Sequence, residues 1–222
     1  MTQSLPAKAF QERRPTKAVR IGAVPVGNGA SVTVQSMTKT DTHDVEATVA
    51  QIRELELWGC DIIRLAVPDE AAARALKPIR ERIRIPLVAD IHFDHKLAIL
   101  AVEAGADGLR INPGNIGSAD KVREVVRAAA PRNIPIRIGV NAGSLEKSLL
   151  AKHGGATAEA LVESALAHVR LLEDAGYREI KISVKASDVG RTVQAYRLLA
   201  EKTDYPLHMG LTEAGTRTAG TV

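Results

Sequence analysis

The chain has 222 residues, of which 45% are apolar and 25% are charged, and its formal net charge at pH 7 is +4. These proportions are ordinary for a globular protein and exclude a disordered chain, a collagen and a disulfide-rich scaffold. The single cysteine, Cys60, excludes an internal disulfide and leaves too few thiolates for an iron–sulfur cluster held by this chain alone.

Membranes and nucleic acids are both poor partners for this sequence. No apolar stretch reaches the roughly 18 residues needed to cross a bilayer, and the N-terminus has no apolar signal-peptide core. The basic runs at 80–84 and 132–137 are interleaved with acidic, proline or apolar residues, and only 3% of residues are aromatic, too few for a base-stacking surface. We therefore predict a cytoplasmic protein that binds neither membranes nor nucleic acids.

Short β-branched segments alternate with amphipathic helical segments from about residue 31 onward. In the first helical segment, Val45, Val49 and Ile52 recur at the spacing of one helix face. The predicted strands are 31–37, 62–67, 87–92, 108–112, 135–140, 179–185 and 206–212, and the predicted helices are 45–58, 71–83, 96–104, 118–130, 158–175 and 189–202. The predicted caps are Ser118 and Ser187 before helices, and Gly59, Gly105 and Gly176 after them.

This alternation predicts right-handed βαβ units around a parallel sheet. A Rossmann fold is disfavoured, because the first strand runs into Met37 and a Thr-rich loop rather than a G-x-G-x-x-G turn. A TIM (β/α)8 barrel has eight strands, so we predict a TIM-type α/β barrel truncated after strand 7. We assign 1–30 to an N-terminal arm, with a hairpin at 19–26 plugging the N-terminal end of the barrel, and 31–222 to the incomplete barrel.

Polar residues interrupt the predicted strands near their C-terminal ends, where strands buried on both faces should be apolar. Within each strand they stand two apart, so they share a face, which in a barrel is the interior. The C-terminal rim of this fold is where its active sites lie. In strand order these residues are Arg64, Asp90, His92, Arg110, Asn112, Arg137, Asn141, Lys181, Ser183, Lys185, His208 and Glu213.

Cations gathered near one barrel axis are costly to bury unless an anion joins them. Asp90 and Glu213 are too few to neutralise them, and arginine presents a planar fork that matches phosphate oxygens. Glycine-containing turns at 112–117 and 141–144 add backbone donors at helix N-termini. We therefore predict an anion-binding rim, with an internal ion-pair network as the alternative.

Six motifs in order resemble the 4-hydroxy-3-methylbut-2-enyl diphosphate synthase family of the methylerythritol phosphate isoprenoid pathway. The resemblance extends from about Arg13 to the end of the chain, and its one small departure is Thr216, where a glycine is expected. The motifs are Val34-Gln-Ser-Met37, Val88-Ala-Asp-Ile-His-Phe93, Leu109-Arg-Ile-Asn-Pro-Gly-Asn-Ile-Gly117, Ile136-Arg-Ile-Gly-Val-Asn-Ala-Gly-Ser-Leu-Glu-Lys147, Ser183-Val-Lys-Ala-Ser-Asp188 and Thr212-Glu-Ala-Gly215.

The resemblance implies a bacterial oxidoreductase that reductively opens 2-C-methyl-D-erythritol 2,4-cyclodiphosphate, with two electrons and loss of water. It also implies a [4Fe-4S] cluster, held by three cysteines and a glutamate of a C-terminal domain and reduced by flavodoxin or ferredoxin. That domain is absent from this chain, so we expect a substrate-binding barrel that is inactive alone. The complete enzyme is expected to be a homodimer.

The resemblance also assigns roles to the rim residues. Glu213 is the expected general acid, and Asp90 and His92 are expected to orient the substrate or the cations. No metal-ligand set is expected in this chain. Two other functions stay open: an anion-binding barrel without catalysis, and a pterin-binding transferase of the dihydropteroate synthase type. The expected substrate-binding residues are Arg64, Arg110, Asn112, Arg137, Asn141, Ser183, Lys185 and His208.

Overall fold

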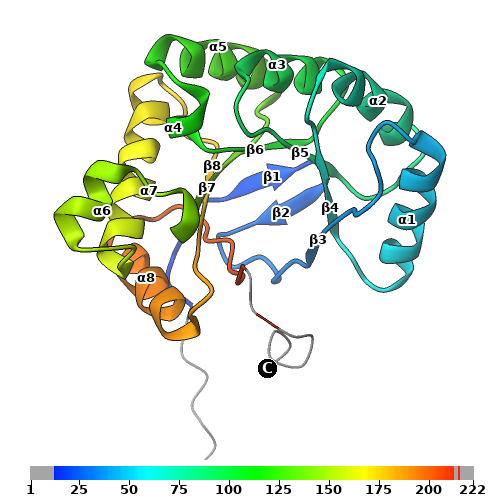
Figure 1. The fold of residues 1–222 in the computed structure, drawn as a ribbon. Coiled ribbons are helices and arrows are strands. Elements are labelled where there is room, and N and C mark those ends of the chain that lie inside the picture. Colours follow the sequence, from blue (N-terminus) through cyan, green and yellow to red (C-terminus); the bar gives the residue numbers. More distant parts are fainter. Residues whose placement is uncertain (1–12, 213–214, 216–222) are drawn as a thin grey trace, which may run out of the picture.

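The structure is a computed structural model that describes residues 13–212 and residue 215. A six-stranded parallel sheet in sequence order curls into the greater part of a barrel, with helices on its outer side (Figure 1). The strands of this sheet are β3 (Gln35–Met37), β4 (Ile62–Ala66), β5 (Leu87–Asp90), β6 (Gly108–Ile111), β7 (Ile136–Asn141) and β8 (Ile180–Lys185). The α/β TIM-type fold class predicted from the alternation is confirmed.

Six long helices follow the strands, and each packs its apolar face on the sheet or on the next helix. They are α1 (Val45–Leu57), α2 (Glu70–Arg80), α3 (His95–Glu103), α5 (Ala119–Ala129), α7 (Ala158–Asp174) and α8 (Val189–Lys202). Shorter helical turns, which the sequence reading did not predict, are α4 (Pro113–Ile116), α6 (Lys147–His153), η1 (Ala130–Arg132) and η2 (Ala142–Ser144). No helix in the described part of the chain is both long and apolar enough to cross a bilayer.

Side-chain caps fix where the helices begin. Ser118 is the N-cap of α5, as predicted, and its hydroxyl accepts a hydrogen bond from the backbone N–H of Lys121. The predicted cap Ser187 is wrong, because Asp188 begins α8 and accepts from the backbone N–H of Arg191 at 2.6 Å. The glycines predicted to follow helices are confirmed: Gly59, Gly105 and Gly176 have φ of +85°, +98° and +77°.

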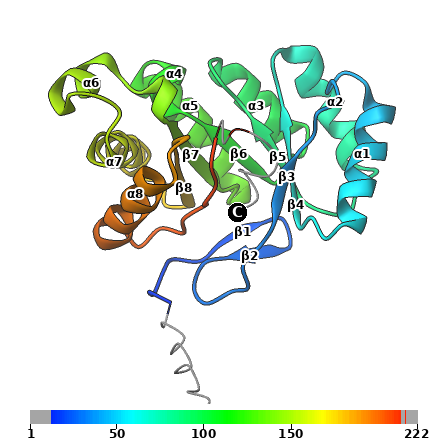
Figure 2. The ribbon, with the colours of Figure 1, turned by 60° about the horizontal axis from the view of Figure 1, so that its bottom comes forward.

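The predicted hairpin is present and closes the bottom of the barrel. Strands β1 (Val19–Ile21) and β2 (Val24–Val26) pair antiparallel, and in Figure 2 they lie beneath one end of the curved sheet. Ile21 packs there against Ile62 and Val88, which stand at or near the N-terminal ends of β4 and β5. The hairpin therefore seals the end opposite to the predicted anion site.

Two predicted strands are shorter than the β-branched pattern suggested. Of 31–37 only Gln35–Met37 is a strand: the Val34 carbonyl still accepts from the Ile62 N–H at 3.2 Å, and no bond to β4 is made before it. The predicted strand at 206–212 is wrong: a single parallel bridge joins Ile182 to Leu207. Within the described residues the sheet therefore ends at β3 on one side and at this bridge on the other.

Candidate functional site

A cavity of about 210 Å³ lies at the C-terminal ends of the sheet strands, where the sequence predicted it. The strand register creates it, because Asp90, Arg110, Arg137 and Lys181 stand side by side on four neighbouring strands. In-register residues of a parallel sheet point to the same face, here the barrel interior. The lining residues are Met37, Arg64, Asp90, His92, Arg110, Arg137, Gly139, Asn141, Ser183, Lys185 and Thr212.

One carboxylate serves several cations in this cavity. The buried Asp90 accepts a hydrogen bond from Arg110 Nη1 at 3.0 Å, and its other oxygen lies 3.5 Å from Arg64 Nε. His92 Nε2 is also 3.5 Å from Asp90, but that side chain is 54% exposed at the lip of the cavity. Internal ion pairing, the alternative left open by the sequence, therefore accounts for Arg64 and Arg110 only in part.

Arg137 forms no ion pair with a carboxylate of the described residues. It is 2% exposed, and its Nε and Nη2 have no hydrogen-bond partner among the described residues. Burial, with the positive charges of Arg64 and Arg110, lowers the pKa of Arg137 to about 9. The guanidinium still carries its charge at neutral pH, and a buried charge without a counter-ion is costly. An anion in the cavity would remove that cost.

The two lysines of β8 extend the cationic surface. Burial and the charge of Arg137 lower the pKa of Lys185 to about 8, and they lower the pKa of the more deeply buried Lys181 to about 7. Residue 210 lies beside this amine: a Cβ at Gly210 would lie 3.3 Å from Lys185 Nζ, so a side chain there would crowd the lysine. Near neutral pH the amine of Lys185, which lines the cavity, is poised to take up a proton when an anion arrives.

Glycine is also required on β7, beneath the guanidinium of Arg110. A Cβ built at Gly139 would lie 2.5 Å from Arg110 Nε, closer than any real contact. Arg110 Nη2 donates to the Gly139 carbonyl at 3.4 Å, so the arginine crosses the strand at this point. The absence of a side chain at Gly139 thus allows Arg110 to reach both Asp90 and the cavity.

Of the predicted site residues, the cavity brings together Arg64, Asp90, His92, Arg110, Arg137, Asn141, Ser183 and Lys185. Asn112 is buried at the end of β6 and does not line it. His208 lines a neighbouring groove together with Lys181, between residues 26–35 and 206–209. Burial and the charges of Arg137, Lys181 and Lys185 lower the pKa of His208 to about 2, which keeps the imidazole neutral. Glu213, the predicted general acid, lies outside the described residues.

Sequence reasoning placed Lys181 in the rim pattern but not among the substrate-binding residues, and it lines the neighbouring groove rather than the cavity. Met37, at the rim end of its strand, was open to a contact or a packing role, and its Sδ lies 2.9 Å from Arg64 Nη2. Thr212 also lines the cavity, which only the path of the chain after β8 could reveal.

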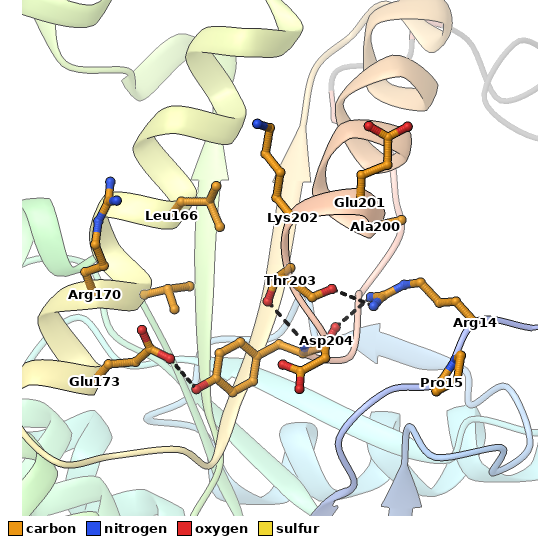
Figure 3. Close-up of a pocket in the computed structure, with 12 residues that line it drawn as sticks. Arg14, Pro15, Leu166, Arg170, Glu173, Ala200, Glu201, Lys202, Thr203 and Asp204 are labelled. Carbon is orange, nitrogen blue, oxygen red and sulfur yellow. Dashed lines mark hydrogen bonds between the residues drawn. The ribbon is translucent and has the colours of Figure 1, made fainter.

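A larger cavity, of about 710 Å³, lies at the other end of the barrel between α7, α8 and the N-terminal arm (Figure 3). Its polar groups are engaged with one another. Arg14 donates to the carbonyls of Thr203 and Tyr205 at 2.6 and 2.8 Å, and Glu173 accepts from the Tyr205 hydroxyl at 2.9 Å. Arg170, Glu201 and Lys202 also line this cavity, but they are exposed to water, so the cavity ties the N-terminal arm to the barrel without burying an unpaired charge.

With the site in view, the comparison with known proteins identifies the family. Residues 16–222 match the GcpE TIM-barrel domain. The chain belongs to this family. It is 62% identical over 207 residues to a Geobacter sulfurreducens protein named 4-hydroxy-3-methylbut-2-en-1-yl diphosphate synthase (flavodoxin), covering 93% of this chain and 59% of that protein. A Thermodesulfovibrio yellowstonii protein of the same name is 57% identical over 211 residues, covering 95% and 60%.

These matches confirm the family that the six motifs predicted. They also show that the chain spans about three fifths of the length of the curated relatives it matches. The relatives' names mention flavodoxin, which is a statement about those longer proteins.

Solved structures of similar shape share little sequence with the GcpE barrel. A Xanthomonas albilineans dihydropteroate synthase has a TM-score of 0.55 at 20% identity, covering 91% of this chain and 79% of that one. A Geobacillus kaustophilus 3-dehydroquinate dehydratase has a TM-score of 0.64 at 13% identity, covering 87% and 79%. At such identities the likeness shows the fold alone, so it gives no support to a pterin-binding function.

The residues described here do not fit an iron–sulfur cluster. Cys60 is the single cysteine of the sequence, and it is buried between α1 and β4, where its thiol donates to the Ile62 carbonyl at 3.1 Å. No group of three or more His, Cys, Asp or Glu in the described part of the chain could hold a metal ion. Ligands for a cluster would have to come from elsewhere.

Proposed function

We propose that this chain is the substrate-binding barrel of an iron–sulfur oxidoreductase that reductively opens 2-C-methyl-D-erythritol 2,4-cyclodiphosphate to 4-hydroxy-3-methylbut-2-enyl diphosphate. Relatives of 57–62% identity bear the name of that synthase, which supports the reaction. One structural observation carries the assignment of substrate binding to this barrel. Arg137 is a buried, charged guanidinium with two unpartnered nitrogens at a cavity lined by further cations.

The cavity suits a small diphosphate better than a larger organic ligand. Its volume of about 210 Å³ is below the roughly 300–1,000 Å³ that is common for drug-sized ligands. Arg137 and Lys185 are the donors with spare capacity, while Arg64 and Arg110 reach the same space from their shared partner Asp90. Charge-assisted hydrogen bonds from such groups are short and strong, so they would hold the phosphates firmly.

The neutral residues of the rim would complete recognition of the ligand. Asn141 and Ser183 line the cavity between the cationic side chains, and their amide and hydroxyl groups can bond phosphate or sugar oxygens. Neither Asn112, buried just after β6, nor the neutral His208, in the neighbouring groove, lines the cavity, and we assign them a supporting place in substrate binding. Glu213 remains our proposed general acid from the motif alone, because the structure does not describe it.

The reduction itself needs groups beyond these residues. We propose that a [4Fe-4S] cluster, held outside the residues described here, supplies the electrons, and that flavodoxin or ferredoxin reduces it in the bacterial cytoplasm. The assembled enzyme is proposed to be a homodimer with a separate C-terminal cluster domain. Within this division of labour, the barrel binds and orients the cyclic diphosphate.

Calorimetric titration of the 222-residue chain tests the proposal. The cyclic diphosphate should bind, unphosphorylated 2-C-methyl-D-erythritol should not, and inorganic pyrophosphate should bind more weakly than the cyclic substrate. Binding of a pterin pyrophosphate with the tightest affinity of the set would instead favour the dihydropteroate synthase type. Failure of every phosphorylated ligand to bind would overturn the proposed function.

A further inference from the structure

The segment that carries His208 runs beside β8 but is only partly joined to it. The Ile182 N–H donates to the Pro206 carbonyl at 3.0 Å, and the His208 N–H donates to the Ile182 carbonyl at 2.8 Å. The regular spacing of a parallel ladder would next join the Val184 N–H to the His208 carbonyl. That bond is not made directly.

A hydroxyl from α8 stands in its place. Tyr196 Oη accepts from the Val184 N–H at 3.3 Å and donates to the His208 carbonyl. Tyr196 is 8% exposed, and burial raises the pKa of its hydroxyl, against opposing effects of Ser183, the Val184 N–H and Arg137. The group is therefore a neutral donor at every ordinary pH, and it bridges the two backbones that a ladder bond would join.

A second hydroxyl from the same helix extends this arrangement by one turn. The Ala186 N–H donates to Thr192 Oγ1 at 3.3 Å, so this N–H too is satisfied by α8 rather than by the neighbouring segment. Thr192 and Tyr196 stand four residues apart, which places them on one helix face. The direct backbone contact resumes only at Thr212, whose N–H points to the Ala186 carbonyl at 3.4 Å.

The ladder is therefore interrupted between His208 and Thr212, and this interruption determines where several residues in and beside the candidate site lie. His208 stands at its start, Gly210 lies against Lys185 Nζ within it, and Thr212 lines the cavity at its end. A direct bond between the Val184 N–H and the His208 carbonyl would draw the segment toward β8 by the thickness of one hydroxyl oxygen. Such a shift would bring Gly210 closer to the Lys185 amine, at a position where an added Cβ would lie 3.2 Å from Lys185 Cε.

We propose that Tyr196 is a positioning residue for diphosphate binding: its hydroxyl replaces a ladder bond and thereby holds residues 208–212 at the distance from β8 that Lys185 and the bound anion require. The role in ligand binding rests on the proposed function above. The spacing of the two backbones does not, because it is a property of the empty protein. The two parts can therefore be tested separately.

Tyr196→Phe removes the hydroxyl and keeps the ring, and the structure offers a matched control. Tyr177 is 5% exposed and donates its hydroxyl to the Ile134 carbonyl at 2.6 Å, just before β7 and away from the cavity. Tyr177→Phe therefore deletes a buried hydroxyl that bonds a main-chain carbonyl, as Tyr196→Phe does. Both variants should melt at lower temperature than the parent protein, because each leaves a main-chain carbonyl without its hydrogen-bond donor.

Only Tyr196→Phe should disturb the site. We expect it to weaken binding of the cyclic diphosphate by about fivefold, the size of one lost hydrogen bond, while Tyr177→Phe changes affinity less than twofold. In the ligand-free protein, the imidazole NMR signals of His208 should move in Tyr196→Phe and stay in place in Tyr177→Phe. Equal affinity and unmoved His208 signals in both variants would show that Tyr196 is only structural.

The outcomes separate the two proposals. If the parent protein binds no diphosphate, the proposed function fails, while the His208 signals still decide whether Tyr196 sets the backbone spacing. If Tyr196→Phe does not fold, Thr192→Val and Thr192→Ser repeat the test one turn away. Thr192→Ser keeps the hydroxyl, so its His208 signals should match those of the parent protein, whereas those of Thr192→Val should shift. If the His208 signals are the same in the two variants, the inference is overturned.

Discussion

The two ends of this barrel treat arginine in opposite ways. At the N-terminal end, Arg14 is used up by the carbonyls of Thr203 and Tyr205, and Lys17 pairs with Asp204 at 3.1 Å. At the C-terminal end, Arg137 is more deeply buried and has two nitrogens without a partner. The cavity whose unpaired charges are all exposed to water is the larger, about 710 against 210 Å³. Unpaired charge that is buried, rather than size, therefore marks the candidate site.

The difference also tells what each arginine does for the protein. An arginine such as Arg14, whose hydrogen bonds go to the protein's own carbonyls, contributes to stability and has no effect on ligand affinity. A buried arginine that lacks a counter-ion lowers the stability of the empty protein and recovers that loss when an anion binds. Substitutions at the two ends should thus have opposite effects on stability and affinity.

The largest effect is expected at Arg137. Arg137→Met should weaken binding of the cyclic diphosphate by more than about 100-fold, because a guanidinium makes two charge-assisted hydrogen bonds of roughly 1.5–3 kcal/mol each. The melting temperature of the empty protein should stay the same or rise, since the substitution removes an uncompensated buried charge. Calorimetric titration and a thermal melt measure both quantities.

Arg14→Met is the matched control at the opposite end. It removes the bonds to the Thr203 and Tyr205 carbonyls, so the protein should melt at lower temperature while its affinity for the diphosphate stays within about twofold of the parent. If Arg137→Met instead lowers the melting temperature and spares affinity, the two ends do not differ and the candidate site has been misassigned.

A smaller effect is expected at Arg110, whose charge Asp90 already partly neutralises. Arg110→Ala should weaken diphosphate binding by roughly 10- to 100-fold, on the same energy scale per hydrogen bond. The fold should stay intact, because Asp90 keeps Arg64 and His92 close by. A lower melting temperature with unaltered affinity would show that the Asp90 cluster is a structural ion-pair network.

Much of this fold could be predicted because its physical signals are local. The β-branched runs of β4 to β8 and the apolar faces of the helices place the elements to within a few residues. The incorrect strand predictions arise where hydrogen-bond partners from other segments decide whether a segment becomes a strand. Residues 31–33 have the composition of a strand but no ladder partner in the described structure. At 206–212 the hydroxyls of Tyr196 and Thr192 accept from the N–H groups of Val184 and Ala186, which a seventh strand would need.

The candidate site shows the same division. Alternation along each strand identified the cations that face the interior, because residues two apart in a strand share a face. Register between strands was not predictable, so the sharing of Asp90 between Arg64 and Arg110 and the isolation of Arg137 could not be foreseen. His208 has the right alternation, yet it lines the neighbouring groove with Lys181, because its segment leaves the ladder after one bridge.

The smallest effect concerns pH and the amine of Lys185. Its pKa is lowered to about 8 by burial and by Arg137, Arg64 and Arg110, and a bound anion would raise it again. Between these two pKa values the complex holds one proton more than the empty protein, so affinity must fall as pH rises. Sulfate is the suitable probe because its own charge does not change in this range. We expect the Lys185 amine to weaken sulfate binding by at most about tenfold from pH 7 to pH 9, the span over which the amine of the empty protein is deprotonated. Arg137, with a pKa of about 9, should add a factor of about two at pH 9 in the parent and in Lys185 variants alike.

Lys185→Arg tests the origin of that slope. Arginine keeps the positive charge and stays protonated through pH 9, so sulfate affinity in this variant should depend on pH much less than in the parent protein.

Lys181 supplies the contrast. Because its pKa is lowered to about 7 from 10.5, the empty fold prefers the neutral amine, and the free energy of unfolding gains a contribution that grows from about pH 7 to pH 10.5. Lys181→Met should flatten this rise in stability and leave the pH slope of sulfate binding in place. Should Lys181→Met remove the binding slope and Lys185→Arg preserve it, the anion would have to sit deeper in the barrel, against Lys181 rather than at the strand ends.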